Sequence, residues 1–224
     1  MIVAIHQPNY LPYLGYFYKI AKCDTFVFLD DAQYSNDAMH NWNRIKTPQG
    51  DFNLKVPVQQ HFGDKICDVI CRDELGWKNK HLRTIEMNYK KASHFHEVYE
   101  ELSILISRST GNLATLNESI IVWMMKKFGI SADIIKSSEL NISSVREERI
   151  IDIVKALGGT VYFSGSGAKV YQDPAHFEKN GIELRYTDYR PIEYKQLWGG
   201  EFIPNLSALD YVMNCGFDNS IFQR

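Results

Sequence analysis

Two short apolar runs near the start of the chain restrict the possible folds most. Residues 2–5 and 25–29 have the β-branched and aromatic composition of buried strands. Between them, residues 14–21 space their apolar side chains by three and four, which predicts a helix. A strand, a helix and a second strand in this order favour parallel strands covered by helices.

The rest of the chain extends this pattern. Residues 43–45 and 54–56 flank a turn at 47–50 and predict a β-hairpin, and a further short strand is predicted at 65–71. Helical spacing follows over 78–87, 95–107 and 112–128. Further strands are predicted at 134–135, 160–163 and 182–186, with helices between them. A Ser144–Glu147 capping box is expected to begin the first of these helices. The prediction is one Rossmann-like α/β domain over 1–224, a mostly parallel sheet flanked by helices, with a helical insertion or lid at about 77–128 and a small β-hairpin.

Composition excludes several classes of protein. The formal net charge of -2 over 224 residues gives no basic surface for bulk nucleic-acid binding. No apolar run reaches the roughly 18 residues that a membrane span needs, and no basic, signal-like segment precedes the first strand. We therefore expect a cytoplasmic protein with no membrane insertion. No Walker A, zinc-finger or HExxH motif is present, so the residues predict no metal and leave the cofactor unknown.

Polar residues follow three of the predicted strands. His6 and Gln7 follow the first, Asp30 and Asp31 the second, and the segment Ser164-Gly165-Ser166-Gly167-Ala168-Lys169 a later one. In open parallel sheets, ligands bind at the carboxyl ends of the strands. The sequence therefore predicts one site built from segments about 150 residues apart.

Histidine suits general acid or base catalysis near neutral pH, and His6 is the only histidine directly after a strand. A structural, hydrogen-bonded histidine is the alternative. Asp30 and Asp31 could orient His6, bind sugar hydroxyls or hold a metal, although a helix cap or turn is as good an explanation for one of them. We assign these three residues as catalytic candidates.

Substrate-binding candidates surround them. Tyr10, Tyr13 and Tyr16 could stack on a sugar or base, with Gln7 and Asn9 beside them and Gly15 allowing close approach. Arg44 and Lys46 could bind phosphate, or could be ordinary surface residues. In the later segment, the backbone N–H groups of Ser164, Gly165, Ser166 and Gly167, with Lys169, could bind an anion. Lys19 and Lys22 add positive charge to the first helix, and we interpret Lys22 as solvated surface.

The string from His6 to Phe17, HQPNYLPYLGYF, resembles the WbqC-like protein family. So do the segments 26–31, 43–47 and 206–210, and the Ser164 to Gly167 segment before Tyr171, so the likeness runs nearly end to end. The resemblance implies a bacterial protein from gene clusters for O-antigen, lipopolysaccharide and other surface polysaccharides. In that context we expect a transferase that modifies an amino sugar on a nucleotide carrier.

The order of strand, proline-bearing loop and helix is also similar, more distantly, to HxGH-type nucleotidylyltransferases. Tyr13-Leu14-Gly15-Tyr16 occupies the place of HxGH, with tyrosines in place of both histidines. In that family the histidines stabilise the phosphate in the transition state, a charge that tyrosine cannot carry.

Three functions therefore stay open. The first is acyl or aminoacyl transfer to the amino group of a nucleotide-linked sugar, from a carrier or the charged end of a tRNA, with His6 as the base. The second is nucleotidylyl transfer that uses a nucleoside triphosphate and Mg²⁺. The third is a non-catalytic partner protein that binds a sugar or nucleotide.

Overall fold

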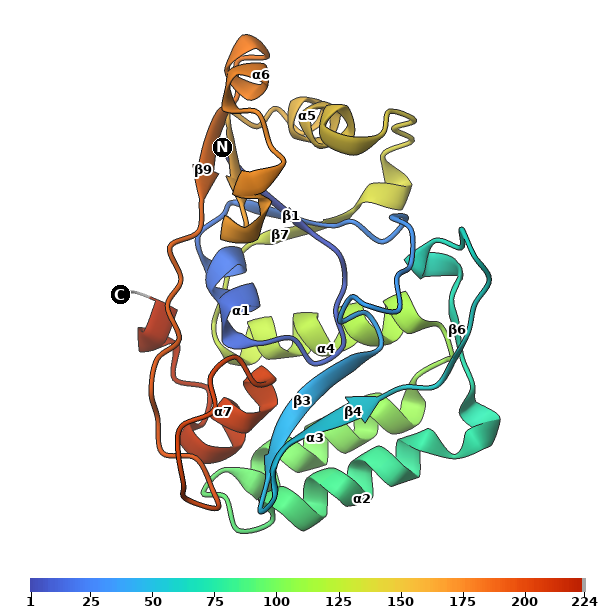
Figure 1. Ribbon diagram of the computed structural model, residues 1–224, viewed down its shortest axis with the longest axis vertical. Coiled ribbons are helices and arrows are strands. Elements are labelled where there is room, and N and C mark those ends of the chain that lie inside the picture. Colours follow the sequence, from blue (N-terminus) through green and yellow to red (C-terminus); the bar gives the residue numbers. More distant parts are fainter. Residues whose placement is uncertain (223–224) are drawn as a thin grey trace.

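A computed structural model describes residues 1–222 and contains a parallel five-stranded sheet (Figure 1). Its strands are β1 (Ile2–His6), β2 (Thr25–Phe28), β7 (Asp133–Lys136), β8 (Val161–Ser164) and β9 (Glu183–Tyr186). They lie in the order β7-β2-β1-β8-β9. The chain therefore adds β2 and β7 on one side of β1, and then β8 and β9 on the other side. This is a doubly wound arrangement whose direction changes between β1 and β8. The predicted α/β, Rossmann-like class is confirmed.

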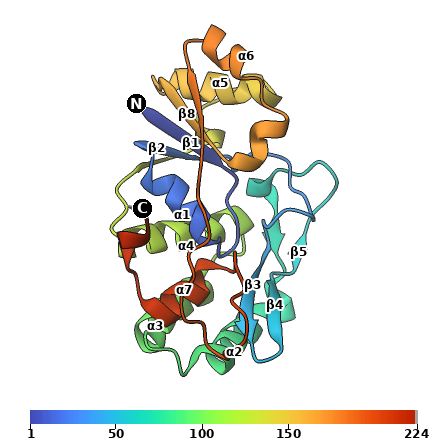
Figure 2. The same cartoon turned by 60° about the vertical axis from the view of Figure 1, so that its left-hand side comes forward.

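Helices cover both faces of the sheet because side chains alternate along each strand. On one face, Ala4, Phe26 and Phe28 pack in the core with α1 (Leu14–Ala21) and α4 (Leu113–Lys127). On the other face, Val3, Ile5 and Val27 pack with α5 (Arg146–Ala156) and α6 (Pro174–Lys179). The two views show these helix pairs on opposite sides of the strands (Figures 1 and 2).

Most of the remaining elements lie beyond α1 and α4, at the end of the molecule opposite α5 and α6 (Figure 1). The strands β3 (Trp42–Thr47) and β4 (Gly50–Lys55) form the predicted hairpin, with Asn43 opposite Leu54. Beside them lie α2 (Trp77–Tyr89), α3 (Phe95–Arg108) and α7 (Ala208–Cys215). A small second ladder pairs β5 (Val58–Gln59) with β6 (Ile70–Cys71). That 77–128 forms an insertion or lid stays a prediction; its last helix, α4, covers the sheet.

Two local predictions are wrong. Within 65–71 only Ile70–Cys71 is a strand, because the N–H groups of Ile66 and Cys67 donate to the carbonyls of Ala32 and Asp30 and turn the segment into a 3₁₀ helix, Ile66–Asp68. The expected capping box is absent from the described start of α5. That helix begins at Arg146, and the Ser144 hydroxyl donates instead to the Asp152 carboxylate at 2.6 Å.

Candidate functional site

A cavity of about 790 Å³ lies at the carboxyl ends of β1 and β8, where the winding of the sheet changes direction. Ligand sites in proteins commonly span about 300–1,000 Å³, and in open α/β sheets they lie at this switch point. The cavity is lined by residues from β1, α1, the start of α5 and the segment after β8. The polar residues that matter most are His6, Gln7, Tyr13, Lys19, Arg146 and Ser164–Gly167. The structure therefore brings together the two polar segments that were expected to converge.

His6 ends β1 and lines the cavity in a neutral form. Its Nδ1 lies 3.0 Å from the carbonyl oxygen of Gln7, which can only accept, so Nδ1 carries the proton and Nε2 keeps its lone pair. The Tyr16 hydroxyl donates to the same carbonyl at 3.0 Å, and its ring meets the imidazole edge-on, with centroids 4.8 Å apart. Burial, and then the charge of Lys19, lower the pKa of His6 to about 3. The imidazole is therefore unprotonated at neutral pH and oriented by backbone and ring contacts.

Lys19 is the buried cation of the cavity. It comes from α1, is only 4% exposed, and donates from Nζ to the Ile5 carbonyl at 2.7 Å. Burial lowers its pKa from the ordinary 10.5 to about 8. Within residues 1–222, no Asp or Glu carboxylate forms an ion pair with it. The cavity therefore holds a positive charge for which residues 1–222 supply no counter-ion.

The segment that begins at the end of β8 also borders the cavity. Ser164 is buried, and its hydroxyl donates to the Gln172 side chain at 2.9 Å, while Ser166–Val170 forms a 3₁₀ helix. Ser164 to Ala168 line the cavity. Lys169 does not belong to the lining; its ammonium lies 5.1 Å from the centre of the Tyr186 ring. The predicted anion-binding segment thus reaches the cavity without its lysine.

The loop after β1 is divided between cavity and core. Tyr13 lines the cavity, and Gly15 lies next to the Tyr13 ring. A Cβ added at Gly15 would fall 2.3 Å from the Tyr13 ring and 2.7 Å from the Tyr189 ring. Gln7 also lines the cavity, with its side-chain oxygen 3.2 Å from His40 Nε2. Gly15 is needed here for close packing of two tyrosine rings.

The remaining loop residues lie away from the cavity lining. Tyr10 is fully buried, and its hydroxyl lies 3.0 Å from His81 Nδ1. Asn9 is half-buried and, like Tyr16, is not among the lining residues. Tyr16 therefore acts on the site only through His6 and Gln7.

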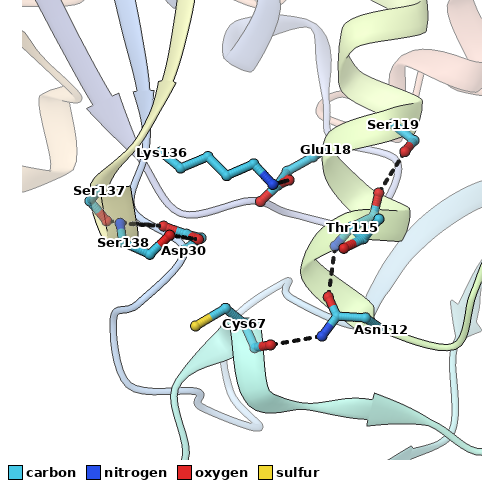
Figure 3. A network of polar contacts seen from close by, with 9 residues as sticks. All are labelled: Asp30, Cys67, Asn112, Thr115, Glu118, Ser119, Lys136, Ser137 and Ser138. Atoms are coloured by element: carbon cyan, nitrogen blue, oxygen red, sulfur yellow. Dashed lines mark hydrogen bonds and ion pairs between the residues drawn. The ribbon is translucent and has the colours of Figure 1, made fainter. Parts of the chain in front are cut away.

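Asp30 and Asp31 connect β2 to the segment after β7. Asp30 is buried and accepts from the N–H and hydroxyl of Ser138, at 3.0 and 2.6 Å, and from the Ser137 hydroxyl at 3.2 Å (Figure 3). Asp31 pairs with Arg149 and also accepts from Ser137. Neither carboxylate lines the cavity, and their contacts with Ser137, Ser138 and Arg149 are those of residues that fix strand ends.

Besides the Asp31–Arg149 pair, another ion pair lies near Asp30. Lys136, at the end of β7, pairs with Glu118 of α4 at 2.6 Å (Figure 3). Burial raises the pKa of the Glu118 carboxyl, although the hydrogen bond and charge of Lys136 oppose the shift. The pair joins α4 to the edge strand of the sheet.

Arg44 and Lys46 also lie outside the cavity lining. Arg44 pairs across the hairpin with Asp51 at 3.1 Å. Lys46 is buried, and its ammonium donates to the Gln196 side chain and to the carbonyls of Gly199 and Glu201, at 3.1, 2.8 and 3.2 Å. With all three N–H groups satisfied, Lys46 fixes the segment before α7 to the hairpin.

Three charged lining residues were not among the site residues predicted from the sequence: Lys19, Arg146 and Glu147. For Lys19 the sequence offered one signal: this lysine lies three residues after Tyr16 and next to Ile20, in a short amphipathic helix. Arg146 has a φ of 57°, a left-handed conformation that no sequence pattern indicated. The Glu147 carboxylate lies 2.8 Å from His176 Nδ1 and accepts from the N–H of Asp173.

Across residues 1–222, no helix is both long and apolar enough to span a membrane. In the same part of the chain, no three His, Cys, Asp or Glu side chains gather as a metal-binding group.

Together, the doubly wound sheet and the cavity at its switch point define an α/β protein of Rossmann-like fold with a candidate ligand site. Residues 7–221 match the model of the WbqC-like protein family, and the chain belongs to that family. It is 37% identical to the uncharacterized protein Rv1507c of Mycobacterium tuberculosis (strain ATCC 25618 / H37Rv) over 226 residues, which cover 99% of this chain and 97% of that protein. These comparisons confirm the family resemblance.

Proposed function

We propose that the protein is a transferase that moves an acyl or aminoacyl group onto the amino group of a nucleotide-linked sugar, in the biosynthesis of a bacterial surface polysaccharide. The cavity at the β1–β8 switch point carries this proposal, because doubly wound sheets bind nucleotides at that place. Its volume of about 790 Å³ suits a ligand of this size. The implied gene context of the WbqC-like family supports the polysaccharide assignment.

His6 is the group best placed for proton transfer. Its Nε2 has a free lone pair, and its pKa of about 3 keeps the imidazole neutral. A bound anion beside the ring would raise this pKa and strengthen the base. As the sugar nitrogen attacks the carbonyl carbon of the donor, a C–N bond forms and the ester or thioester bond breaks. The amine proton passes to His6 Nε2 and then to the departing oxygen or sulfur.

The contacts of Asp30 and Asp31 revise one part of the expected mechanism. Both carboxylates accept hydrogen bonds from the segment after β7, so in this proposal the carbonyl of Gln7 and the ring of Tyr16 orient His6. In this proposal Lys19 and the segment Ser164 to Gly167, which line the cavity, would bind the ligand's phosphates, whereas Arg44 and Lys46 lie outside the lining.

The test measures binding first and turnover second. UDP-, dTDP-, GDP- and CMP-linked sugars, with and without an amino group, are titrated by calorimetry. Ligands that bind are then incubated with acyl-CoA, acyl carrier protein or aminoacyl-tRNA, and the product mass is measured. The expected result is an N-acylated sugar nucleotide, formed much more slowly by His6→Ala but normally by His61→Ala, whose imidazole side chain is 79% exposed. Full turnover by His6→Ala refutes the base assignment.

Nucleotidylyl transfer is the second candidate, because the segment in the place of HxGH reaches the cavity through Tyr13. Since tyrosine cannot carry the charge of those histidines, the cation near the phosphate would have to be Lys19, which lines the same cavity. Release of pyrophosphate from a nucleoside triphosphate, dependent on Mg²⁺, would establish it in place of acyl transfer. Tight binding with no turnover by any donor would instead make the protein a binding partner of another polysaccharide enzyme.

A further inference from the structure

The position and the hydrogen bonding of the Lys19 ammonium are those of a ligand-binding group. It is only 4% exposed, yet it lines the cavity beside His6. An ammonium has three N–H donors, and in the described chain the carbonyl of Ile5 takes one of them. A buried charge without a counter-ion is costly to keep, so a structural role alone is a poor explanation for it.

The other charged groups of the cavity do not neutralise Lys19. Arg146 is also a cation and is exposed. The Glu147 carboxylate is already engaged, with His176 Nδ1 at 2.8 Å and the N–H of Asp173 at 2.9 Å. His6 is neutral near physiological pH. The cavity therefore carries uncompensated positive charge, with its buried part on Lys19.

We propose that Lys19 binds an oxyanion of the ligand, a phosphate or a carboxylate, deep in the cavity. This inference rests on the proposed function for the cavity as the ligand site, and it adds the chemistry by which the ligand is held. The remaining N–H groups of Nζ would donate to the anionic oxygens, giving the charge-assisted hydrogen bonds that are strongest in partly buried sites. Phosphate belongs to a nucleotide carrier and carboxylate to a sugar acid or acyl donor, so the two sources can be separated experimentally.

A specific consequence is proton uptake on binding. Because the pKa of Lys19 lies near 8, the amine is about half protonated at pH 8, and a bound anion favours the charged form. Binding at pH 8 should therefore take up as much as about half a proton. The other titratable groups that interact with Lys19 are His6 and Cys23, whose pKa values of about 3 and about 12 leave them uncharged at this pH. Calorimetry in buffers of different ionisation enthalpy measures the uptake.

The experiment compares Lys19→Met, Lys19→Arg and the control Lys22→Met in the full chain, with inorganic pyrophosphate and D-glucuronate as probes. Lys22 lies three residues further on, at the end of α1, with its ammonium 5.4 Å from the centre of the Tyr18 ring and outside the cavity lining. We expect Lys19→Met to weaken binding about tenfold or more and Lys22→Met to leave affinity unchanged. The proton uptake is measured with D-glucuronate, which has no titrating group near pH 8, and Lys19→Met should abolish it while Lys22→Met retains it. Lys19→Arg should retain affinity but take up no proton at pH 8, because a guanidinium stays charged.

The outcomes are distinguishable. Lys19-dependent binding of pyrophosphate identifies phosphate as the anion, and Lys19-dependent binding of glucuronate identifies carboxylate. If wild type binds neither probe, or if Lys19→Met binds as tightly as wild type, the inference is wrong. Circular dichroism checks that the methionine variant folds; should it not fold, the affinity and proton uptake of Lys19→Arg decide the question in its place. Anion binding without any sugar acylation would refute the proposed transferase and leave this inference standing.

Discussion

Replacing Lys19 with methionine should change how the stability of the protein depends on pH. Burial lowers the pKa of the lysine from 10.5 to about 8 in the folded chain, whereas the unfolded chain restores the ordinary value. Between these two pH values the unfolded state binds more protons than the folded state, so stability rises with pH. Methionine has no proton to lose, and the Lys19→Met variant lacks this contribution.

The magnitude follows from the two pKa values. A shift of one pKa unit corresponds to about 1.4 kcal/mol, so the lysine should gain about 2 kcal/mol of unfolding free energy relative to methionine between about pH 7 and 9.5. Other groups titrate in the same range, notably the Cys23 thiol, whose pKa burial raises to about 12. Their effects are nearly equal in both proteins and cancel in the difference.

The assay is urea denaturation of both proteins, followed by tryptophan fluorescence at several pH values from about 7 to 9.5 in a reducing buffer. The expected result is a difference in unfolding free energy, wild type minus variant, that increases steadily with pH. A difference that stays constant would show that the Lys19 ammonium is well solvated. It would remove the physical basis for assigning it a buried ligand charge.

Three further predictions concern the surroundings of the site. Gly15→Ala should displace the Tyr13 ring and lower stability by about 1–3 kcal/mol in urea denaturation, because its Cβ would fall 2.3 Å from that ring; an unchanged midpoint would contradict this packing. Asp210→Ala should cost about 2–4 kcal/mol in thermal or urea unfolding, since the fully buried carboxylate accepts from two tyrosine hydroxyls at 2.6 and 2.8 Å; a loss below about 0.5 kcal/mol would refute it. For Asp31, burial opposes ionisation, but hydrogen bonds from Ser137 and Arg149 prevail and hold its pKa below 3.8. Arg149→Gln should therefore be less stable than wild type at neutral pH, and the gap should close as the pH falls below about 3.8, as measured by acid unfolding.

Local sequence patterns determined the elements that position the site. The helix at Leu14–Ala21 has the predicted bounds, and the first two strands and the hairpin differ from prediction by only a few residues. These elements could be predicted because their apolar spacing and turn residues act within a few positions of the chain. The capping box failed for the opposite reason: Ser144 found a partner eight residues away, at Asp152.

The sequence by itself determined that His6 ends a strand and that a Gly/Ser segment ends another, and parallel pairing was enough to expect them at one edge. Only the tertiary structure decided which charged groups reach the cavity. Asp30, Asp31 and Lys46 are satisfied by distant serines, an arginine and backbone carbonyls. Lys19 lies in the cavity, and no acidic side chain of the described chain pairs with it. The physical reason is that a charged side chain's role depends on desolvation and on partners more than 100 residues away, and local patterns carry neither.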